Sequence, residues 1–119
     1  MVGRITRWFL VFIWAGFIFY LSSIPSLTTG LGIWDLILRK IAHFGEFGIF
    51  TFLNFFAFSY KKVMKKYLLI SGIIAMLYAF TDELHQAFVP GRYATALDIL
   101  IDGTGVMFAM WLIVKNRKL

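Results

Sequence analysis

Four long apolar stretches, separated by short polar segments, set the pattern of this 119-residue chain. The first is the clearest, because no charged residue occurs between Trp8 and Trp34. A helix that crosses a bilayer core needs roughly 20 predominantly apolar residues. The pattern therefore predicts an all-α fold, an integral membrane bundle of four antiparallel transmembrane helices joined by short connections. We expect a single domain over residues 1–119, with spans at about 6–23, 41–58, 67–88 and 97–114.

The composition excludes an ordinary soluble domain. Hydrophobic residues make up 61% of the chain and charged residues 15%, whereas a soluble domain is nearer half apolar and a quarter charged. A chain this short cannot bury so much apolar surface by folding on itself. The net charge of +6 does not indicate nucleic acid, because the basic residues form short clusters between apolar stretches, as in loops that face anionic lipid. The absence of cysteine rules out disulfides and thiolate metal sites.

The first apolar stretch has a second interpretation, as a cleaved signal peptide. Arg4 and Arg7 precede it, and the small residues Ser22 and Ser23 follow it, which is the usual order in such a peptide. The stretch is long and rich in aromatic residues, and no A-x-A cleavage site follows. We therefore interpret it as a retained span.

Basic residues indicate how the chain is oriented. With four spans, the N-terminal arm, the second loop and the C-terminal tail share one side of the membrane. That side carries Arg4, Arg7, Lys61, Lys62, Lys65, Lys66, Lys115, Arg117 and Lys118. The opposite side carries only Arg39, Lys40 and Arg92. An excess of Lys and Arg marks the cytoplasmic side, so both termini are predicted to lie in the cytoplasm.

Acidic and histidine residues gather on the other, outer side. They are Asp35, Glu46, Asp82, Glu83, Asp98, Asp102, His43 and His85. A charged side chain costs about 2.5–3.5 kcal/mol at the centre of a bilayer on insertion scales, so such groups face the bundle interior and find partners. We therefore predict a polar cluster in the outer leaflet. Asp35 is expected in a solvated loop, and His85 is expected to face the lipid headgroups.

Helical spacing predicts which residues share a face. Neighbours three or four positions apart lie on one side of a helix, and this relation joins Lys40, His43 and Glu46, then Asp82 and Gln86, then Asp98 and Asp102. Three helices should each bring one polar face to the cluster. The first span has no such face and is expected to wrap the outside.

Asp82 and Glu83 are the strongest candidates for a functional role. Adjacent helical residues point about 100° apart, so one partner seldom satisfies both carboxylates. A positioned carboxylate or imidazole can act as a general acid or base, which makes Asp82, Glu83 and His43 the candidate catalytic residues. Candidate substrate-binding residues are Lys40, Glu46, Gln86, Arg92, Asp98 and Asp102. The cations of Lys40 and Arg92 suit a phosphate or carboxylate.

Simpler structural interpretations stay open for several of these residues. Lys40 could only extend its amine to the membrane surface, and His43 and Glu46 could bond each other. Thr95 and Asp98 fit a capping box at the start of the fourth helix.

A metal site is not assigned from the sequence. Six acids meet three bases on the outer side, which leaves room for a bound proton or a divalent metal, and Asp, Glu, His and Gln are all possible ligands. However, no H-E-x-x-H or comparable motif occurs. No residue is therefore predicted as a metal ligand, and the cofactor stays unknown.

The segment from Tyr78 to Asp98 carries a family resemblance. It reads Y-A-F-T-D-E-L-H-Q-A-F-V-P-G-R-Y-A-T-A-L-D and resembles the D-E-x-x-Q-x-F-x-P-G-R signature of the VanZ-like family. Lys40 and His43, followed by Glu46, and the Ser-Ser-x-Pro element at 22–25 are similar to further parts of that family. The resemblance covers residues 20–110. The chain departs from it at Asp102, where the family often shows Asn, and at Phe47, where it often shows Tyr.

The resemblance implies a bacterial inner-membrane protein with a role in resistance to the glycopeptide teicoplanin, without change to the D-Ala-D-Ala target. Some relatives bear a phosphotransbutyrylase label, but no nucleotide or coenzyme A site is readable here. A phenotype does not define a reaction.

Three functions compete. The first is an outer-leaflet site that binds or modifies a membrane lipid, a lipid-linked cell-wall precursor or a lipoglycopeptide. The second is an intramembrane hydrolase or transferase that uses acid–base or metal chemistry at Asp82, Glu83 and His43. The third, a proton-coupled transporter, needs polar groups across the whole membrane, and only Thr51 and Asn54 continue the polar face of the second helix. Oligomeric state is left open, although Gly103 and Gly105 permit close helix contact.

Overall fold

Four helices make up the protein. The computed structural model describes residues 3–23, 32–89 and 96–117, and for Leu36 the backbone alone. Within these ranges there is no strand, and the helices are α1 Arg4–Ser23, α2 Ile33–Phe58, α3 Lys65–Ala87 and α4 Ala96–Arg117. Each is long and apolar enough to cross a membrane. The prediction of an all-α fold with four transmembrane helices is therefore confirmed.

The largest difference from the predicted boundaries is at the start of α2. This helix begins at Ile33 rather than near Ile41. Asp35 lies in its first turn and is buried, so the prediction that Asp35 is a solvated loop residue is wrong. Asp35, Arg39 and Lys40 lie before the predicted start of the second span. A helix can nevertheless continue past the apolar core, and an acid in its first turn interacts favourably with the helix dipole.

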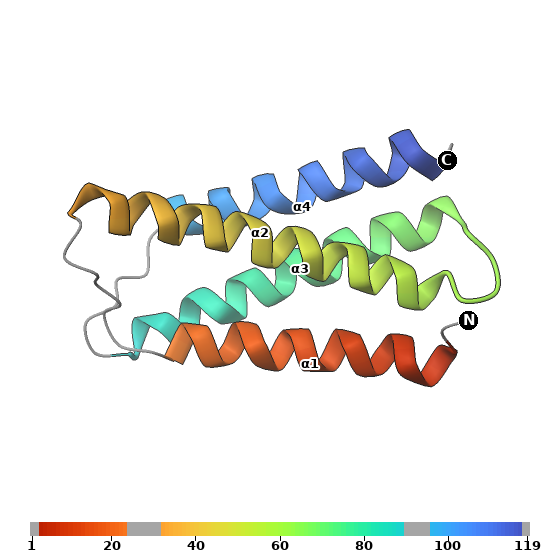
Figure 1. Cartoon of the computed structure of the whole chain (residues 1–119), viewed down its shortest axis with the longest axis horizontal. Coiled ribbons are helices and arrows are strands. Elements are labelled where there is room, and N and C mark those ends of the chain that lie inside the picture. The colour runs from red at the N-terminus through yellow and green to blue at the C-terminus, as the bar shows by residue number, and fades with distance from the viewer. Residues whose placement is uncertain (1–2, 24–31, 90–95, 118–119) are drawn as a thin grey trace.

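Successive helices run in alternate directions along the long axis (Figure 1). The start of α1 lies beside the end of α2, as the hydrogen bond from Arg7 Nη1 to the carbonyl of Phe56 shows. The ends of α1 and α3 lie together, because Gln86 Nε2 donates to Ser22 Oγ. We call the end of the bundle where α1 and α3 finish the acid end. The opposite end, with the connection at residues 59–64, is the lysine end.

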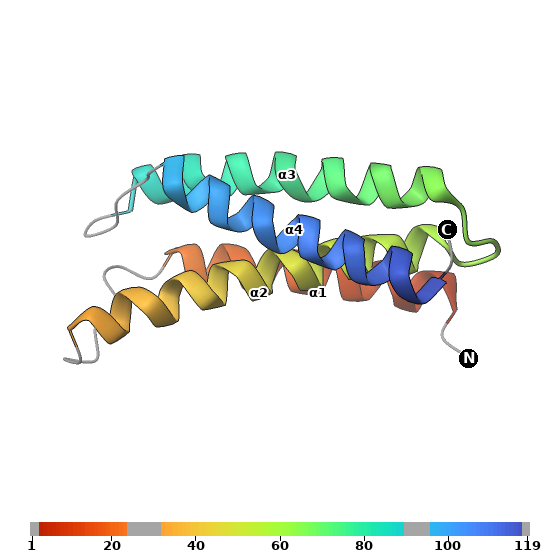
Figure 2. The ribbon, with the colours of Figure 1, turned by 90° about the horizontal axis from the view of Figure 1, so that it is seen from above.

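The middle pair, α2 and α3, separates α1 from α4. In the described ranges α1 contacts α2 and α3 but not α4, and α4 contacts the same two helices. Figure 2 shows α4 crossing obliquely past α3. The molecule measures 46 × 26 × 22 Å. Its long axis exceeds the ~30 Å of a bilayer hydrocarbon core, so both ends can reach the headgroup regions.

Helices α2 and α4 approach each other closely at Gly105. A Cβ added to Gly105 would lie 2.2 Å from the carbonyl oxygen of Phe44, and one added to Gly48 would lie 3.2 Å from the carbonyl oxygen of Gly105. Small residues allow such contact in lipid, as predicted for Gly105. Gly103 instead faces the Met76 side chain at an ordinary distance of 3.4 Å. Gly105 therefore sets the spacing of the two helices that carry most of the acid-end charges.

Candidate functional site

All four helices contribute to one group of polar side chains at the acid end, which we call the polar cluster. Its members are Ser22, Lys40, His43, Asp82, Gln86, Asp98 and Asp102. All except Lys40 are buried. Six of the seven are residues that helical spacing had placed on inward faces. Side chains far apart in the sequence thus meet at one end of the bundle.

Two cross-helix contacts join α2 to α4. Lys40 Nζ pairs with Asp98 Oδ1, and His43 Nδ1 hydrogen-bonds Asp102 Oδ1 at 3.0 Å. The partners are three positions apart on α2 and four on α4, so the contacts lie one helical turn from each other. Lys40 thus binds within the bundle instead of only extending to the surface.

The capping box proposed for α4 involves Thr95, which lies outside the described residues. Asp98 does stand in the first turn of α4, where a carboxylate is favourable. Its pairing with Lys40 nevertheless shows that a local capping role is not its whole contribution.

The contact between α1 and α3 is built on Ser22. Its hydroxyl donates to Asp82 Oδ1 and accepts from Gln86 Nε2 at 3.0 Å. Gln86 Nε2 also lies 3.3 Å from Asp82 Oδ2. Ser22 is only 2% exposed, so the prediction that the first span brings no polar group to the cluster is wrong. A single hydroxyl at the end of an apolar stretch also fits a helix boundary, so the sequence alone does not predict this role. The only signal for a larger role was the Ser-Ser-x-Pro element of the family resemblance.

The remaining predicted residues lie around this cluster. Glu83 is buried on α3 next to Asp82. Glu46 is half-buried on α2, and its carbonyl accepts a hydrogen bond of 2.9 Å from Trp14 Nε1. Because His43 Nδ1 bonds Asp102, the imidazole ring is oriented from α4, by a contact that spacing along α2 alone does not predict.

Arg92, the other predicted anion-binding residue, lies outside the described residues, and so do Pro90 and Gly91 of the predicted P-G-R turn. The cation that the structure does place in the cluster is Lys40.

His85 is held against α1 at the acid end. Its Nε2 lies 2.8 Å from Ser23 Oγ, and its ring stacks on Phe19 with centroids 4.3 Å apart. These contacts add a second polar link between α1 and α3 at the acid end.

Polar groups in the middle of the bundle do not extend the cluster. Thr51 Oγ1 donates to the carbonyl of Phe47, and Asn54 Nδ2 donates to the carbonyl of Phe50, each at 2.8 Å within α2. Such bonds satisfy a side chain on its own helix. This arrangement gives the transporter hypothesis no support.

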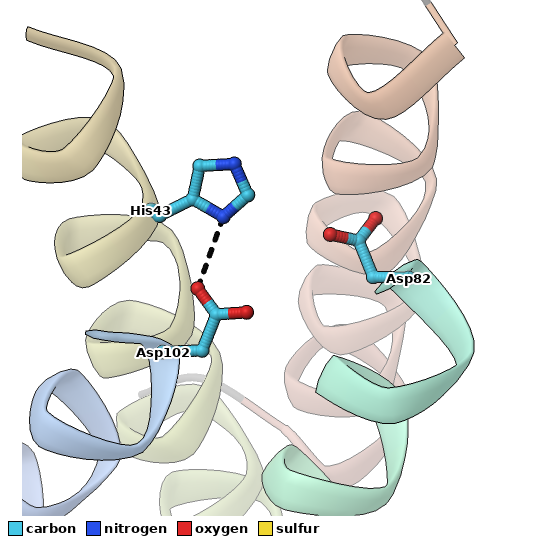
Figure 3. Close-up of side chains that lie close together, drawn as sticks. All are labelled: His43, Asp82 and Asp102. Carbon is cyan, nitrogen blue, oxygen red and sulfur yellow. Dashed lines mark hydrogen bonds and ion pairs between the residues drawn. The ribbon is translucent and has the colours of Figure 1, made fainter. Parts of the chain in front are cut away.

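The centre of the cluster offers groups for acid–base or cation chemistry. One ligand atom each from His43, Asp82 and Asp102 lies within 4.8 Å of the others, and the three side chains converge from α2, α3 and α4 (Figure 3). An imidazole bonded to a carboxylate can accept or donate a proton in a fixed direction. The same three groups are the ones in the described part of the chain that could hold a metal ion.

Comparison with known proteins supports the resemblance stated from the sequence. The model of the VanZ/LLP1 family matches residues 7–116, nearly the whole chain. No curated protein and no solved structure matches.

Proposed function

The chain belongs to the VanZ/LLP1 family and is a multi-pass membrane protein, and from this premise we propose that its polar cluster binds or modifies an amphiphile in the outer leaflet. The substrate classes are a membrane lipid, a lipid-linked cell-wall precursor and a lipoglycopeptide. The protein would lie in the bacterial inner membrane and contribute to teicoplanin resistance, as the family resemblance implies.

The position of the cluster is the observation that carries this proposal. Buried polar groups of four helices meet at one end of a bundle whose outer surface exposes large apolar residues along its length. A water-soluble ligand would have to leave water and cross apolar lipid to reach the cluster from the side of the bundle, which is unfavourable. A molecule with an acyl chain and a polar head can place its chain along the helices and its head at the acid end.

An apolar groove between α3 and α4 supports the same class of ligand. Its volume is about 680 Å³, and its lining includes Ile99 and Gly103. These residues directly follow Asp98 and Asp102 of the polar cluster on α4. An acyl chain in this groove would place its headgroup at the acid end, on the turns of α4 that carry both buried carboxylates.

The distribution of basic residues supports the orientation. The lysine end carries the connection with Lys61 and Lys62, and α4 ends there with Lys115 and Arg117 in its last turn. Positively charged loops stay on the cytoplasmic side. The acid end would then face the exterior, where cell-wall precursors and glycopeptides are met.

A second candidate function is supported by the contact between His43 and Asp102. An imidazole oriented by a carboxylate is a general base, and its burial excludes bulk water. Hydrolysis or group transfer would then use an activated water, or a hydroxyl of the substrate, as nucleophile. Product analysis separates this function from binding alone.

We expect resistance to depend on Asp82. Expression of the chain in a teicoplanin-sensitive bacterium should raise the minimal inhibitory concentration, and Asp82→Asn should return it close to the value of the host. The amide keeps the shape of the side chain but removes the charge held by Ser22 and Gln86. Thr81→Ala is the matched control, because Thr81 is exposed and bonds only the carbonyl of Tyr78 on its own helix.

The same variants can be studied in purified form. Thermal unfolding with a polyprenyl phosphate or phosphatidylglycerol should show stabilisation of the wild-type protein and of Thr81→Ala but not of Asp82→Asn. Mass spectrometry of the recovered lipid shows whether it has been modified. Full resistance in Asp82→Asn, at equal protein levels, would contradict the proposal.

A further inference from the structure

Three side chains at the centre of the polar cluster form a group that no short sequence motif predicts. His43, Asp82 and Asp102 come from α2, α3 and α4, and one ligand atom of each lies within 4.8 Å of the others. Their exposed fractions are 9%, 5% and 0%. Two carboxylates and one imidazole thus meet in a place largely closed to water.

One oxygen of this group has no hydrogen bond. Asp102 Oδ1 bonds His43 Nδ1, but Oδ2 is buried and has no hydrogen-bond partner in the described part of the chain. In Figure 3 this second oxygen is turned toward the side from which Asp82 enters. A buried carboxylate oxygen without a partner is costly. Its direction therefore indicates a ligand between the two carboxylates.

The charge of the group indicates that this ligand is a cation. Two carboxylates that face each other in a buried site repel strongly. The nearby amine of Lys40 already pairs with Asp98, one turn away on α4. A dication between Asp82 and Asp102, with neutral His43, would bring the net charge of the group to zero.

From these observations we propose that His43, Asp82 and Asp102 bind a divalent transition-metal ion, with Zn²⁺ as the best fit. Zn²⁺ takes His nitrogen and Asp oxygen at about 2.0–2.2 Å, and sites that act on substrates combine three protein ligands with an open fourth position. Two such ligands lie roughly 3–3.6 Å apart around the ion, close to the 3.0 Å between His43 Nδ1 and Asp102 Oδ1. Only a small movement of Asp82 is required.

Hydrogen bonds from neighbouring side chains fix the orientation of the Asp82 carboxylate. Ser22 donates to its Oδ1, and Gln86 Nε2 lies 3.3 Å from its Oδ2. Carboxylates that ligate metals are commonly held by hydrogen bonds of this kind. The proposal departs from our expectation of no metal ligand, because the three ligands come from three helices and produce no short sequence motif.

Metal binding can be measured without any lipid substrate, so this test is independent of the proposed function. The full chain, purified in detergent and stripped with a chelator, is titrated with ZnCl2 against a competing chelator. We expect one Zn²⁺ per chain by elemental analysis. Asp102→Asn should weaken binding by at least about 100-fold, since loss of a mere supporting partner already costs roughly 10–100-fold.

Matched controls identify the ligands. The chain has only two histidines, so His43→Gln should abolish binding while His85→Gln keeps it. Asp35→Asn removes one carboxylate from the same end of the bundle and should leave the affinity unchanged. Circular dichroism and gel filtration show which variants are folded.

The wild-type protein gives a second readout that needs no variant. Co²⁺ in place of Zn²⁺ should produce the visible absorption of a tetrahedral site, and excess Zn²⁺ should remove it. No Zn²⁺ bound to the wild-type protein would overturn the proposal. Binding lost in His85→Gln but kept in His43→Gln would also overturn it.

Discussion

Gly105→Ala is expected to lower the free energy of unfolding more than a Gly→Ala substitution at any other described glycine. The new Cβ would lie 2.2 Å from the carbonyl oxygen of Phe44 and 3.0 Å from its carbon. These are backbone atoms and cannot rotate away, so α2 and α4 must move apart. Overpacking commonly costs about 1–3 kcal/mol and occasionally more, and a clash with a helix backbone places this variant at or above the upper limit. The separation would also disturb the pairs that Lys40 and His43 form with α4.

Gly45→Ala is the matched control for this experiment. Gly45 lies in the same α2 helix, next to Phe44, and a Cβ added there meets nothing within 4 Å. Alanine is the better helix former by about 1 kcal/mol, so this variant should be as stable as the wild-type protein or more so. Reversible unfolding in mixed detergent micelles measures both free energies. Equal stability of Gly105→Ala and Gly45→Ala would show that α2 and α4 are not in close contact.

Lys40→Glu is expected to have the second-largest effect, because it places a carboxylate against Asp98. Removal of one partner from a buried ion pair costs about 3–5 kcal/mol. The Lys40 side chain is 28% exposed and solvent screens part of its charge, so we expect a loss of about 2–4 kcal/mol when repulsion is included. The same unfolding measurement determines the value.

Reversal of both charges provides the control. In Lys40→Glu/Asp98→Lys the opposite charges face each other again, and at least half of the lost stability should return. A double-mutant cycle isolates this pairwise contribution from other effects of each substitution. A double variant that loses the sum of the two single losses would show that the residues do not interact.

The fold could be predicted because span length and composition are dictated by the bilayer. Every backbone polar group in lipid must be satisfied within the segment, which leaves the helix as the structure for an apolar stretch of this length. Helical spacing likewise predicted that Asp98 and Asp102 share a face. These predictions needed no information about neighbouring helices.

The pairing between helices could not be predicted in the same way. Which residue faces His43 depends on how α2 and α4 are rotated and shifted against each other, and the close approach at Gly105 fixes both. Spacing along α2 makes Glu46 the nearest candidate partner, whereas in the structure His43 Nδ1 hydrogen-bonds Asp102 of α4. Ser22 was missed for the same reason, because its role depends on Asp82 and Gln86 of a distant helix.

The departures from the family pattern lie inside the bundle. Asp102, where the family often shows Asn, is fully buried and bonded to His43. Phe47, where the family often shows Tyr, is fully buried with its ring 6.3 Å from that of Tyr78. The first departure adds a negative charge at the centre of the polar cluster, which is where the proposed cation would bind.

Cysteine cross-linking tests most directly whether side chains of different helices meet at the acid end. The chain contains no cysteine, so introduced pairs react without interference. A short bifunctional thiol reagent should link Ser22→Cys to Gln86→Cys, and His43→Cys to Asp102→Cys, in native membranes. The outward-facing control pairs, Tyr20→Cys with Leu84→Cys and Leu38→Cys with Leu100→Cys, lie on exposed positions at the same end and should not link. Equal yields for control and cluster pairs would contradict the convergence of these helices on one polar cluster.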